Sequence, residues 1–492
     1  MSIRPIRLTL LVCSGLFLAG CLDPPEARFV YREETGNLTT KVRKAVEEQI
    51  EQSFGTPHDL VAWLKLPLDY GGIKGTVAAG DSVLAPPINK FPIEFDEENL
   101  EKLKAAYADD KGAINFPPGG LRLDWISGEA TGSSIVVTGY QAEQGLATTA
   151  EPFTEKLPAE GTELILTAGT NLQAGRKLYM VHCMHCHGVS GDGNGPTARY
   201  LNPLPRDYRL GEFKFKSTLT PERISSDDLA RVIKYGIPGT YMPSFLLLKE
   251  SESHALVEYV RWLAMRGEIE YKVGNDLAID FSNKAIRERG AGGESAEEIG
   301  ASIDSAVNDL VELYDTMGAD VAELWANAET EDALVNPPIP RIPDSKESRE
   351  RGRMFFLQKC TNCHGNTGLG NGQMTIDFQK NDATGQLYEN PGLHNIWGHK
   401  VQPRNLKQGQ YRGGRRPIDL YRRIYAGISP SKMPNFATSP PETIWDAVNY
   451  VLHVPFESPG EYAEIDAKYE EMKKAGLIQE DGAAGSATPG NE

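Results

Sequence analysis

The apolar residues in the middle of the chain follow a helical spacing. Between positions 299 and 317 they recur every three or four residues among acidic ones, namely Ile299, Ile303, Val307, Leu310, Tyr314 and Met317. This spacing places them on one face, so the segment is predicted to form an amphipathic helix. Its apolar face must pack against neighbouring domains or against a partner. The proline-rich stretch 336–343, which ends the interval 268–345, predicts a semi-rigid linker.

Residues 22–169 show a mixed pattern. Helical spacing occurs near 41–54 and 97–106, whereas residues 134–138 read Ser-Ile-Val-Val-Thr, which is typical of a strand. Glycine and proline interrupt the whole region. We therefore expect a mixed α/β or irregular region of unknown fold. It either caps the unit that follows or acts as a spacer without an independent fold.

Two other segments, 170–267 and 346–457, have matching helical patterns and chemistry. Each has an Asp-Leu pair that begins fourteen residues before a Met-Pro pair. The front halves match in register with one another, and so do the back halves, but the second copy has a net insertion between His364 and Asp419. We interpret the two segments as a tandem duplication of a small all-α unit.

Three helices are predicted in each unit, one before a pair of cysteines, one before the Met-Pro pair and one at the end. A glycine lies eight residues before the first cysteine of each pair, at Gly175 and Gly352. These glycines are predicted to let the first helix cross the last one closely, near Tyr259 in the first copy and Tyr450 in the second.

Composition and charge place the chain among globular proteins with several domains. It has 492 residues, of which 40% are hydrophobic and 24% charged. The 68 acidic residues outnumber the 51 basic ones, and the formal net charge is −17. Because the sequence has no concentrated basic stripe, we expect no nucleic acid among the partners.

The N-terminus has the layout of a secretory signal. Arg4 and Arg7 precede an apolar run over 8–18, which is too short to span a bilayer comfortably. The segment ends Leu-Ala-Gly-Cys21 and resembles a bacterial lipobox. We predict a signal over 1–20 and a lipid anchor on Cys21 that attaches the protein to a membrane, facing the periplasm or exterior. The alternative is an ordinary signal peptide with an incidental cysteine.

Four cysteines then remain, and they form two copies of one motif. Both copies read Cys-x-x-Cys-His, the pattern of c-type haem attachment: Cys183, Cys186 and His187, then Cys360, Cys363 and His364. Two thiols one helical turn apart can form thioethers to the porphyrin vinyl groups, and the histidine can then bind the iron. The competing interpretations are a redox disulfide in each motif and a zinc site built from both motifs.

Each unit resembles a class I c-type cytochrome domain. The resemblance implies a mainly α fold with two tandem cytochrome c-like helical domains, preceded by the mixed or irregular region. It also implies two covalently bound haem c groups, with His187 and His364 as iron ligands. The family's sixth ligand is a methionine at the position of Met242 and Met433. A thioether ligand raises the reduction potential and blocks the site for oxygen or peroxide.

Two weaker motifs recur beside the haem motifs. A Pro-Arg pair, at Pro205–Arg206 and at Pro403–Arg404, could offer its proline carbonyl to the ligand imidazole. Its arginine could pair with haem propionates, or it could be a solvated arginine in a turn. Glycine-rich loops at 191–195 and 368–372 are predicted to be tight turns beside the haem rather than phosphate-binding loops.

The first functional hypothesis is a membrane-anchored dihaem cytochrome that transfers single electrons and catalyses no reaction of its own. By family analogy, its partners are a quinol-oxidising complex, a terminal oxidase or a soluble cytochrome. The alternative from another class is a dihaem peroxidase-like enzyme with one open haem site. A third is an adhesion or scaffold protein with incidental haem. Residues 458–492 are predicted to form a C-terminal helix and a disordered tail.

Overall fold

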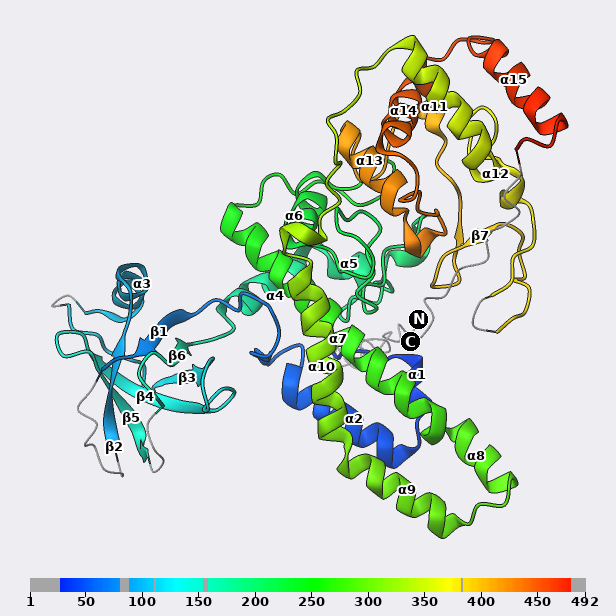
Figure 1. Cartoon of the computed structure of the whole chain (residues 1–492). Helices are drawn as coiled ribbons and strands as arrows, with labels where there is room; N and C mark the ends of the chain where they lie inside the picture. Colours follow the sequence, from blue (N-terminus) through cyan, green and yellow to red (C-terminus); the bar gives the residue numbers. More distant parts are fainter. Residues whose placement is uncertain (1–26, 80–87, 110–111, 154–157, 382–383, 479–492) are drawn as a thin grey trace, which may run out of the picture.

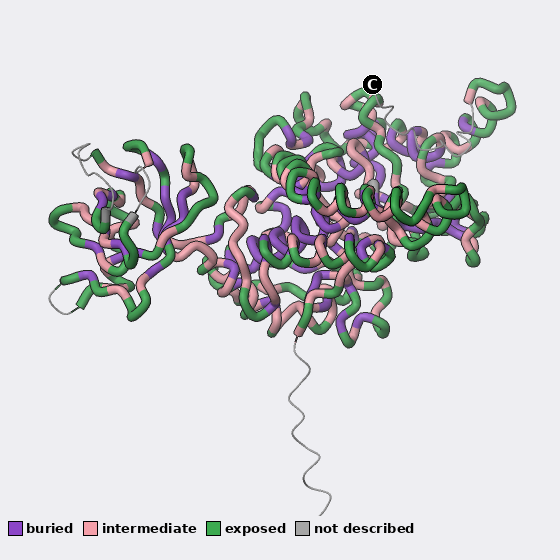
Figure 2. The backbone as a smooth tube through the Cα atoms, turned by 90° about the horizontal axis from the view of Figure 1, so that it is seen from below, coloured by how far each residue is buried: buried purple, intermediate pink, exposed green. Residues whose placement is uncertain are grey.

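The computed structural model describes residues 27–79, 88–109, 112–153, 158–381 and 384–478. It contains a β-barrel, two helical units and a group of helices beside the first unit (Figure 1). The barrel lies to one side of the helical body, to which a narrow neck joins it (Figure 2). The predicted signal segment, Cys21 and the end of the tail lie outside the described residues. Within the ranges given, no helix is long and apolar enough to cross a membrane.

The barrel is closed and antiparallel, with strand order β1-β2-β5-β4-β3-β6. Pairing of β1 with β6 closes it. Its strands are β1 (Ile73–Val77), β2 (Ile88–Glu94), β3 (Leu121–Trp125), β4 (Ser134–Gln141), β5 (Leu146–Phe153) and β6 (Glu163–Leu166). Helix α3 (Glu97–Tyr107) connects β2 to the next segment. Phe91, Leu123, Trp125, Val137 and Leu164 fill the interior and are fully buried, as expected for a small barrel.

The predicted fold class is therefore wrong in one part. The N-terminal region is neither irregular nor mixed α/β in the expected sense, because a six-stranded barrel occupies most of it. Glycine and proline inside the strands concealed the pattern. A Cβ atom on Gly75 of β1 would lie 2.6 Å from the carbonyl oxygen of Glu94. Gly139 of β4 lies at a register shift, and Pro92 lies within β2. The two helical units that the prediction also contained are present.

The first unit begins directly after β6. Its helices are α4 (Thr170–His182), α5 (Met184–His187), η1 (Ala198–Tyr200), α6 (Ser226–Tyr235) and α7 (Glu250–Phe281). A Cβ atom on Gly175 of α4 would lie 2.1 Å from the carbonyl oxygen of Ala255 and 2.7 Å from Cβ of Tyr259. The predicted close crossing of the first and last helices is thus confirmed, since only glycine lets the two backbones approach this closely.

The second unit repeats this arrangement. Its helices are α11 (Lys346–Lys359), α12 (Thr361–His364), η3 (Gln373–Thr375), η4 (Leu406–Gln408), α13 (Pro417–Ala426), η5 (Ser429–Ser431), α14 (Pro441–His453), η6 (Val454–Phe456) and α15 (Ala463–Lys474). Gly352 of α11 lies against α14, where a Cβ atom would be 2.1 Å from the carbonyl oxygen of Asp446. A short hairpin, β7 (Leu393–His394) and β8 (Lys400–Val401), lies between the histidine motif and α13.

Helix α7 joins the first unit to the rest of the helical body. It runs for 32 residues, past residue 267, and buries several charged side chains. Each has a partner: Arg223 and the indole N–H of Trp325 both donate to Glu268, at 2.5 and 3.0 Å, and Arg261 donates to Glu258 at 2.8 Å. Pairing of this kind offsets the cost of desolvating the charges.

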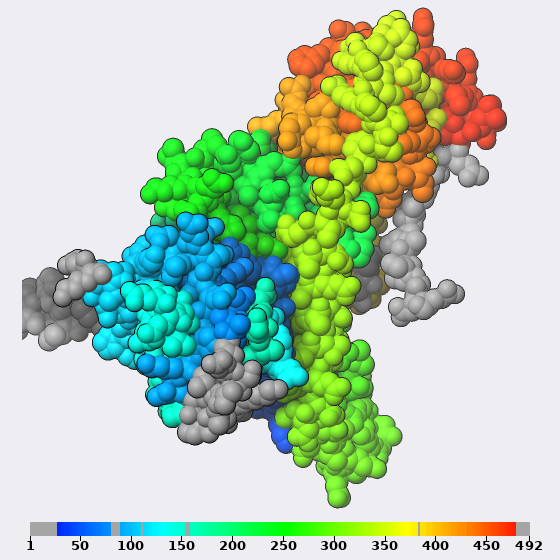
Figure 3. All heavy atoms as spheres, turned by 60° about the vertical axis from the view of Figure 1, so that its left-hand side comes forward, coloured from blue at the N-terminus to red at the C-terminus, as the bar shows by residue number. Residues whose placement is uncertain are grey.

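The helices that pack around α7 come from both sides of it in the sequence. They are α1 (Glu33–Gly36), α2 (Thr40–Phe54), α8 (Asn283–Ala291), α9 (Ala296–Asn308), α10 (Leu310–Asn327) and η2 (Glu331–Ala333). The predicted amphipathic segment is two helices, α9 and α10, which meet at Asp309. The spacing continues because Asp309 keeps a right-handed helical conformation. Tyr314 and Trp325 are buried in the core shared with α2 and α7, and α10 extends beside the N-terminal segment (Figure 3).

The two units contact each other through equivalent helices, α6 and α13. Arg231 of α6 donates to Asp228 at 2.6 Å and to Asp419 of α13 at 2.8 Å, and these two aspartates occupy the same position of the duplicated pattern. The proline-rich segment 336–343 docks on α14, where Asn449 donates to the carbonyl oxygen of Ile342 at 3.1 Å. The duplication has therefore produced two helical units with separate hydrophobic cores, which meet at this ion pair (Figure 1).

Candidate functional site

The two Cys-x-x-Cys-His motifs adopt the same backbone structure. Helices α4 and α11 end at the first cysteine, and the short helices α5 and α12 contain the second cysteine and the histidine. The amide of His187 donates to the carbonyl of Cys183 at 2.9 Å, and the amide of His364 donates to that of Cys360 at 2.9 Å. One turn of helix thus separates the residues of each motif, as attachment to one ring requires.

The four thiols are free, and all are partly buried. Burial raises the pKa of the Cys183 and Cys360 thiols to about 12. A thiol of this kind is protonated at neutral pH, unlike the thiolate of a disulfide-exchange motif. Within the described ranges, no group of three or more histidine, cysteine or acidic residues is arranged to hold a metal ion. Geometry therefore supports neither the redox-disulfide interpretation nor the shared zinc site.

Both motif histidines are oriented by a backbone carbonyl. Nδ1 of His187 lies 3.1 Å from the carbonyl oxygen of Arg206, and Nδ1 of His364 lies 3.2 Å from that of Arg404. The predicted acceptors, the carbonyls of Pro205 and Pro403, are therefore wrong by one residue. Burial lowers the pKa of both imidazoles. A neutral ring that donates through Nδ1 has its Nε2 lone pair available for iron.

The glycine-rich loops close around the two motifs. The amide of Gly195 donates to the carbonyl of Cys186, and the amide of Gly372 donates to that of Cys363, both at 3.1 Å. A Cβ atom on either glycine would lie within 2.4 Å of a carbonyl oxygen of the motif. The predicted turns are thus confirmed, and their glycines are needed for close backbone approach.

Two residues beside the second cysteines escaped the sequence analysis. Sγ of Cys186 lies 3.3 Å from Oγ1 of Thr197, and Sγ of Cys363 lies 3.6 Å from Sδ of Met374. Thr197 and Met374 occupy equivalent positions in the two copies, in the same register as the two pairs of cysteines. Extending the comparison of the two copies past the glycine loops could have found them.

The loops that contain Met242 and Met433 are held in the same way. The amide of Ile237 donates to the carbonyl of Met242 at 3.2 Å, and the amide of Ile428 donates to that of Met433 at 2.9 Å. Both methionines are half-buried. Three residues later, Phe245 and Phe436 anchor each loop to the preceding helix through equivalent backbone bonds of 3.2 Å. Ligation by the two methionines stays a prediction.

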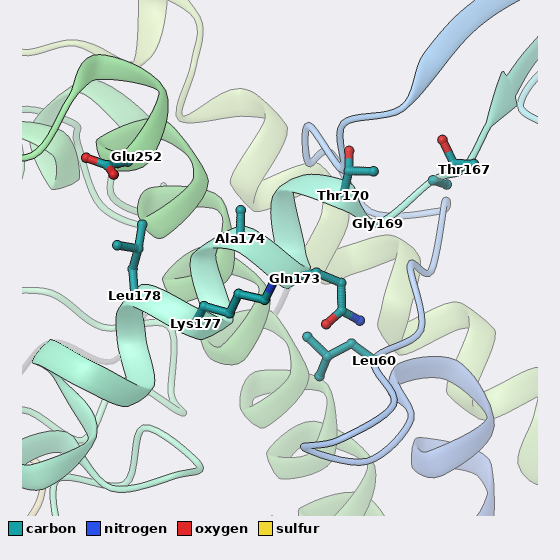
Figure 4. A pocket seen from close by; sticks show the side chains of 10 residues that line it. Leu60, Thr167, Gly169, Thr170, Gln173, Ala174, Lys177, Leu178 and Glu252 are labelled. Carbon is teal, nitrogen blue, oxygen red and sulfur yellow. The ribbon is translucent and has the colours of Figure 1, made fainter. Parts of the chain in front are cut away.

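One cavity of the described residues lies away from these motifs. It has a volume of about 560 Å³ and runs along the N-terminal part of α4, next to the end of β6 (Figure 4). Its lining includes Leu60, Gln173, Leu178 and the charged residues Lys177 and Glu252. No cluster of ligating side chains faces it, and we assign it no role.

The residues of each site suit a covalently bound haem. Two unpaired thiols one turn apart, a neutral histidine with a fixed ring and glycine loops that fit only without Cβ atoms recur in both units. Fold and sites together define a protein with two similar helical domains, each with the residue set that covalent attachment of a haem requires.

Comparison with known proteins agrees with this class. The cytochrome c family model matches residues 172–264 and 349–455. The two helical units are thus similar to cytochrome c domains, and such domains imply covalently bound haem c and haem-based electron transfer. No curated protein matches the sequence. Among solved structures, a chain of the Kuenenia stuttgartiensis reducing HAO-like protein complex matches with 20% identity and a TM-score of 0.40, covering 57% of this chain and 96% of that one. Similarity this low supports no argument about function.

Proposed function

We propose that this protein is a dihaem c-type cytochrome, anchored to a membrane by a lipid on Cys21 and facing the periplasm or exterior. It transfers single electrons between respiratory-chain partners, either as a free carrier or as a subunit of a complex. Its partners are a quinol-oxidising complex, a terminal oxidase or a soluble cytochrome. The observation that supports this proposal is the equivalent construction of both sites, including both methionine loops.

When bound, haem supplies an iron that alternates between the ferric and ferrous states. The protein's residues do the rest. The cysteines fix the ring to α5 and α12, and the carbonyls of Arg206 and Arg404 keep each imidazole in the orientation that ligates iron. Met242 and Met433 would supply the second protein ligand to each iron, which would favour ferrous iron and exclude other ligands. Such a centre suits electron transfer better than bond-making chemistry.

Covalent attachment at both sites is the first test. We expect mass spectrometry of the denatured protein to show two haems per chain, one on the peptide with Cys183 and Cys186 and one on the peptide with Cys360 and Cys363. Replacing both cysteines of one motif with alanine is expected to remove one haem and leave the other. Disulfide-linked or zinc-bound peptides over these residues would contradict the proposal.

The lipid anchor is tested separately. Because no described helix can cross a membrane, we expect attachment to depend on Cys21. Cys21→Ser should release a soluble protein that still contains haem, measured by fractionation of membranes and by haem staining. The control is Cys13→Ser, which changes a cysteine inside the predicted signal. If Cys21→Ser stays in the lipid phase, the lipobox assignment is wrong.

One difference between the backbones of the two units favours the peroxidase-like alternative. Lys432, directly before Met433, is one of two described non-glycine residues with a positive φ, at 61°. Strained backbone of this kind is found at functional positions, and the first unit has no counterpart before Met242. If the second haem lacks a methionine ligand, it offers an open site for peroxide. Its spin state, read from the visible spectrum of the resting protein, distinguishes the two functions.

A further inference from the structure

Four basic side chains gather where the two cytochrome c domains meet. Arg206 and Lys214 come from the first domain, and Arg404 and Arg412 come from the second. The guanidinium of Arg412 crosses the boundary and donates to the carbonyl of Gly239 at 3.2 Å. Positive charge in one place is unexpected in a chain whose net charge is −17.

None of the four makes an ion pair with a carboxylate of the described residues. The acids nearest to Arg206 are already paired: Asp207 binds Arg209 at 2.9 Å, and Glu212 binds Arg223 at 3.1 Å. Burial and the neighbouring arginines lower the pKa of Lys214 to about 7. All four are half-buried, and basic groups gathered in a partly desolvated place without an anion are in an unfavourable environment.

Two hydrogen-bond donors at the same place are also unused. Nε1 of Trp397 and Nε of Arg412 are buried and have no acceptor within the part of the chain that the structure describes. Native proteins rarely leave a buried donor unsatisfied. Excess positive charge and unsatisfied donors therefore indicate that this cluster accommodates an anionic acceptor.

Trp397 comes from the second domain but contacts the first. The Arg206 guanidinium lies over its ring, 3.9 Å from the ring centre. The tryptophan lies in the turn between β7 and β8, where the side chain of Asn395 accepts from the amides of Trp397 and His399 at 3.0 and 2.9 Å. This hairpin lies between His364 and Asp419, the interval that is longer in the second copy than in the first.

The basic cluster begins beside the first haem site, and this position indicates which anion it binds. Arg206 also supplies the carbonyl that orients His187, so its side chain begins beside the first haem site. A haem carries two propionate carboxylates at one edge of its ring, and carboxylates pair well with arginine, lysine and indole N–H donors.

We propose that Trp397 and Arg412 of the second domain, with Arg206 and Lys214 of the first, bind the propionates of the first haem and thereby raise its reduction potential. This inference rests on the proposed function, because it requires haem at Cys183 and Cys186. Positive charge and hydrogen-bond donors beside a propionate disfavour the additional positive charge of ferric iron. The second domain thus raises the reduction potential of a haem that is attached to the first domain.

Redox titration of the full-length, haem-loaded protein tests this inference. At a fixed ambient potential, Lys214→Met is expected to increase the ferric-to-ferrous ratio of the first haem about tenfold, a downward shift of about 59 mV. Trp397→Phe, which keeps the ring but loses the donor, is expected to increase it about threefold. Lys214→Arg keeps the charge and should retain the wild-type potential. Arg415→Met is the matched control, since it removes an exposed positive charge three residues from Arg412.

The identity of the responding haem is read in a Cys360→Ala/Cys363→Ala background, which retains the first haem alone. A shift there supports the inference. A shift seen only when the second haem is present, or shifts no larger than that of Arg415→Met, would overturn it. Mass spectrometry beforehand shows whether haem is attached at Cys183 and Cys186. Its absence would refute the proposed function, whereas attached haem with an unchanged potential would refute this inference alone.

Discussion

Met242→Ala is expected to convert the first haem from low-spin to high-spin and to let it bind carbon monoxide. Under the proposed function Met242 supplies the sixth ligand, so its removal opens that position, and alanine offers no replacement ligand. Met242→His is expected to keep the iron low-spin but to lower its potential by on the order of 0.1 V, because imidazole supports ferric iron better than a thioether does and axial ligands set haem potentials over a range of about 0.8 V. Visible spectra and redox titration measure both effects.

Met433→Ala and Met433→His are expected to act on the second haem in the same way, since the carbonyls of Met242 and Met433 accept equivalent hydrogen bonds. Met317→Ala is the control, because Met317 lies in helix α10, packs against the helical core and belongs to neither motif. An unchanged spectrum and potential for Met433→Ala would mean that the second haem has another ligand or none. The peroxidase-like alternative would then become the better account of this domain.

Gly352→Ala is expected to destabilise the second domain by about 3 kcal/mol, the upper part of the range for inserting a methyl group into a packed core. The new Cβ atom would lie 2.1 Å from the carbonyl oxygen of Asp446 and 2.7 Å from Cβ of Tyr450. Both atoms belong to α14 and cannot rotate away, so α11 and α14 must separate. Thermal unfolding, monitored by circular dichroism and by haem absorbance, measures the effect.

Gly300 provides the matched control for this substitution. It lies in helix α9, and a Cβ atom there would meet no atom within 4 Å. Gly300→Ala is therefore expected to stabilise the protein by about 0.5 kcal/mol, through the lower entropy of the unfolded chain. Equal stability of the two variants would show that the close crossing of α11 and α14 does not exist in solution.

The parts of this protein that the sequence predicts well depend on short-range chemistry. Two cysteines and a histidine within five residues specify one backbone turn. Gly175 indicates a helix crossing, because a larger residue could not occupy its position. The acceptor for His187 was missed by one residue, since a repeated Pro-Arg pair does not reveal which carbonyl the loop turns inward. The fold of the barrel was missed for a different reason. Its closing strands, β1 and β6, lie far apart in the chain, and neither shows a partner locally.

Trp397 was missed because it belongs to an insertion. A comparison of the two copies detects what they share, whereas the basic cluster depends on a hairpin that only the second copy contains. The division between α9 and α10 at Asp309 was also not visible in the sequence, because the apolar spacing continues through this residue. Asp309 keeps right-handed helical dihedral angles, its amide donates to the carbonyl of Ser305, and its carbonyl accepts from the amide of Leu313.

Helix α7 has a consequence for how the protein matures. Trp262 on this helix packs against Phe29 and Phe54, at ring distances of 5.9 and 5.4 Å, while Glu268 accepts from Trp325. The core of the first domain therefore includes residues as far apart in the sequence as Leu38 and Trp325. The core of the second domain is built only from residues after 334. In a chain made from its N-terminus, Trp325 of the first core follows Cys186 by 139 residues, whereas Tyr462 of the second core follows Cys363 by 99. The first domain can therefore complete its core only after a longer stretch of chain has followed its motif, so its two thiols stay accessible on an incompletely folded chain for longer than those of the second domain.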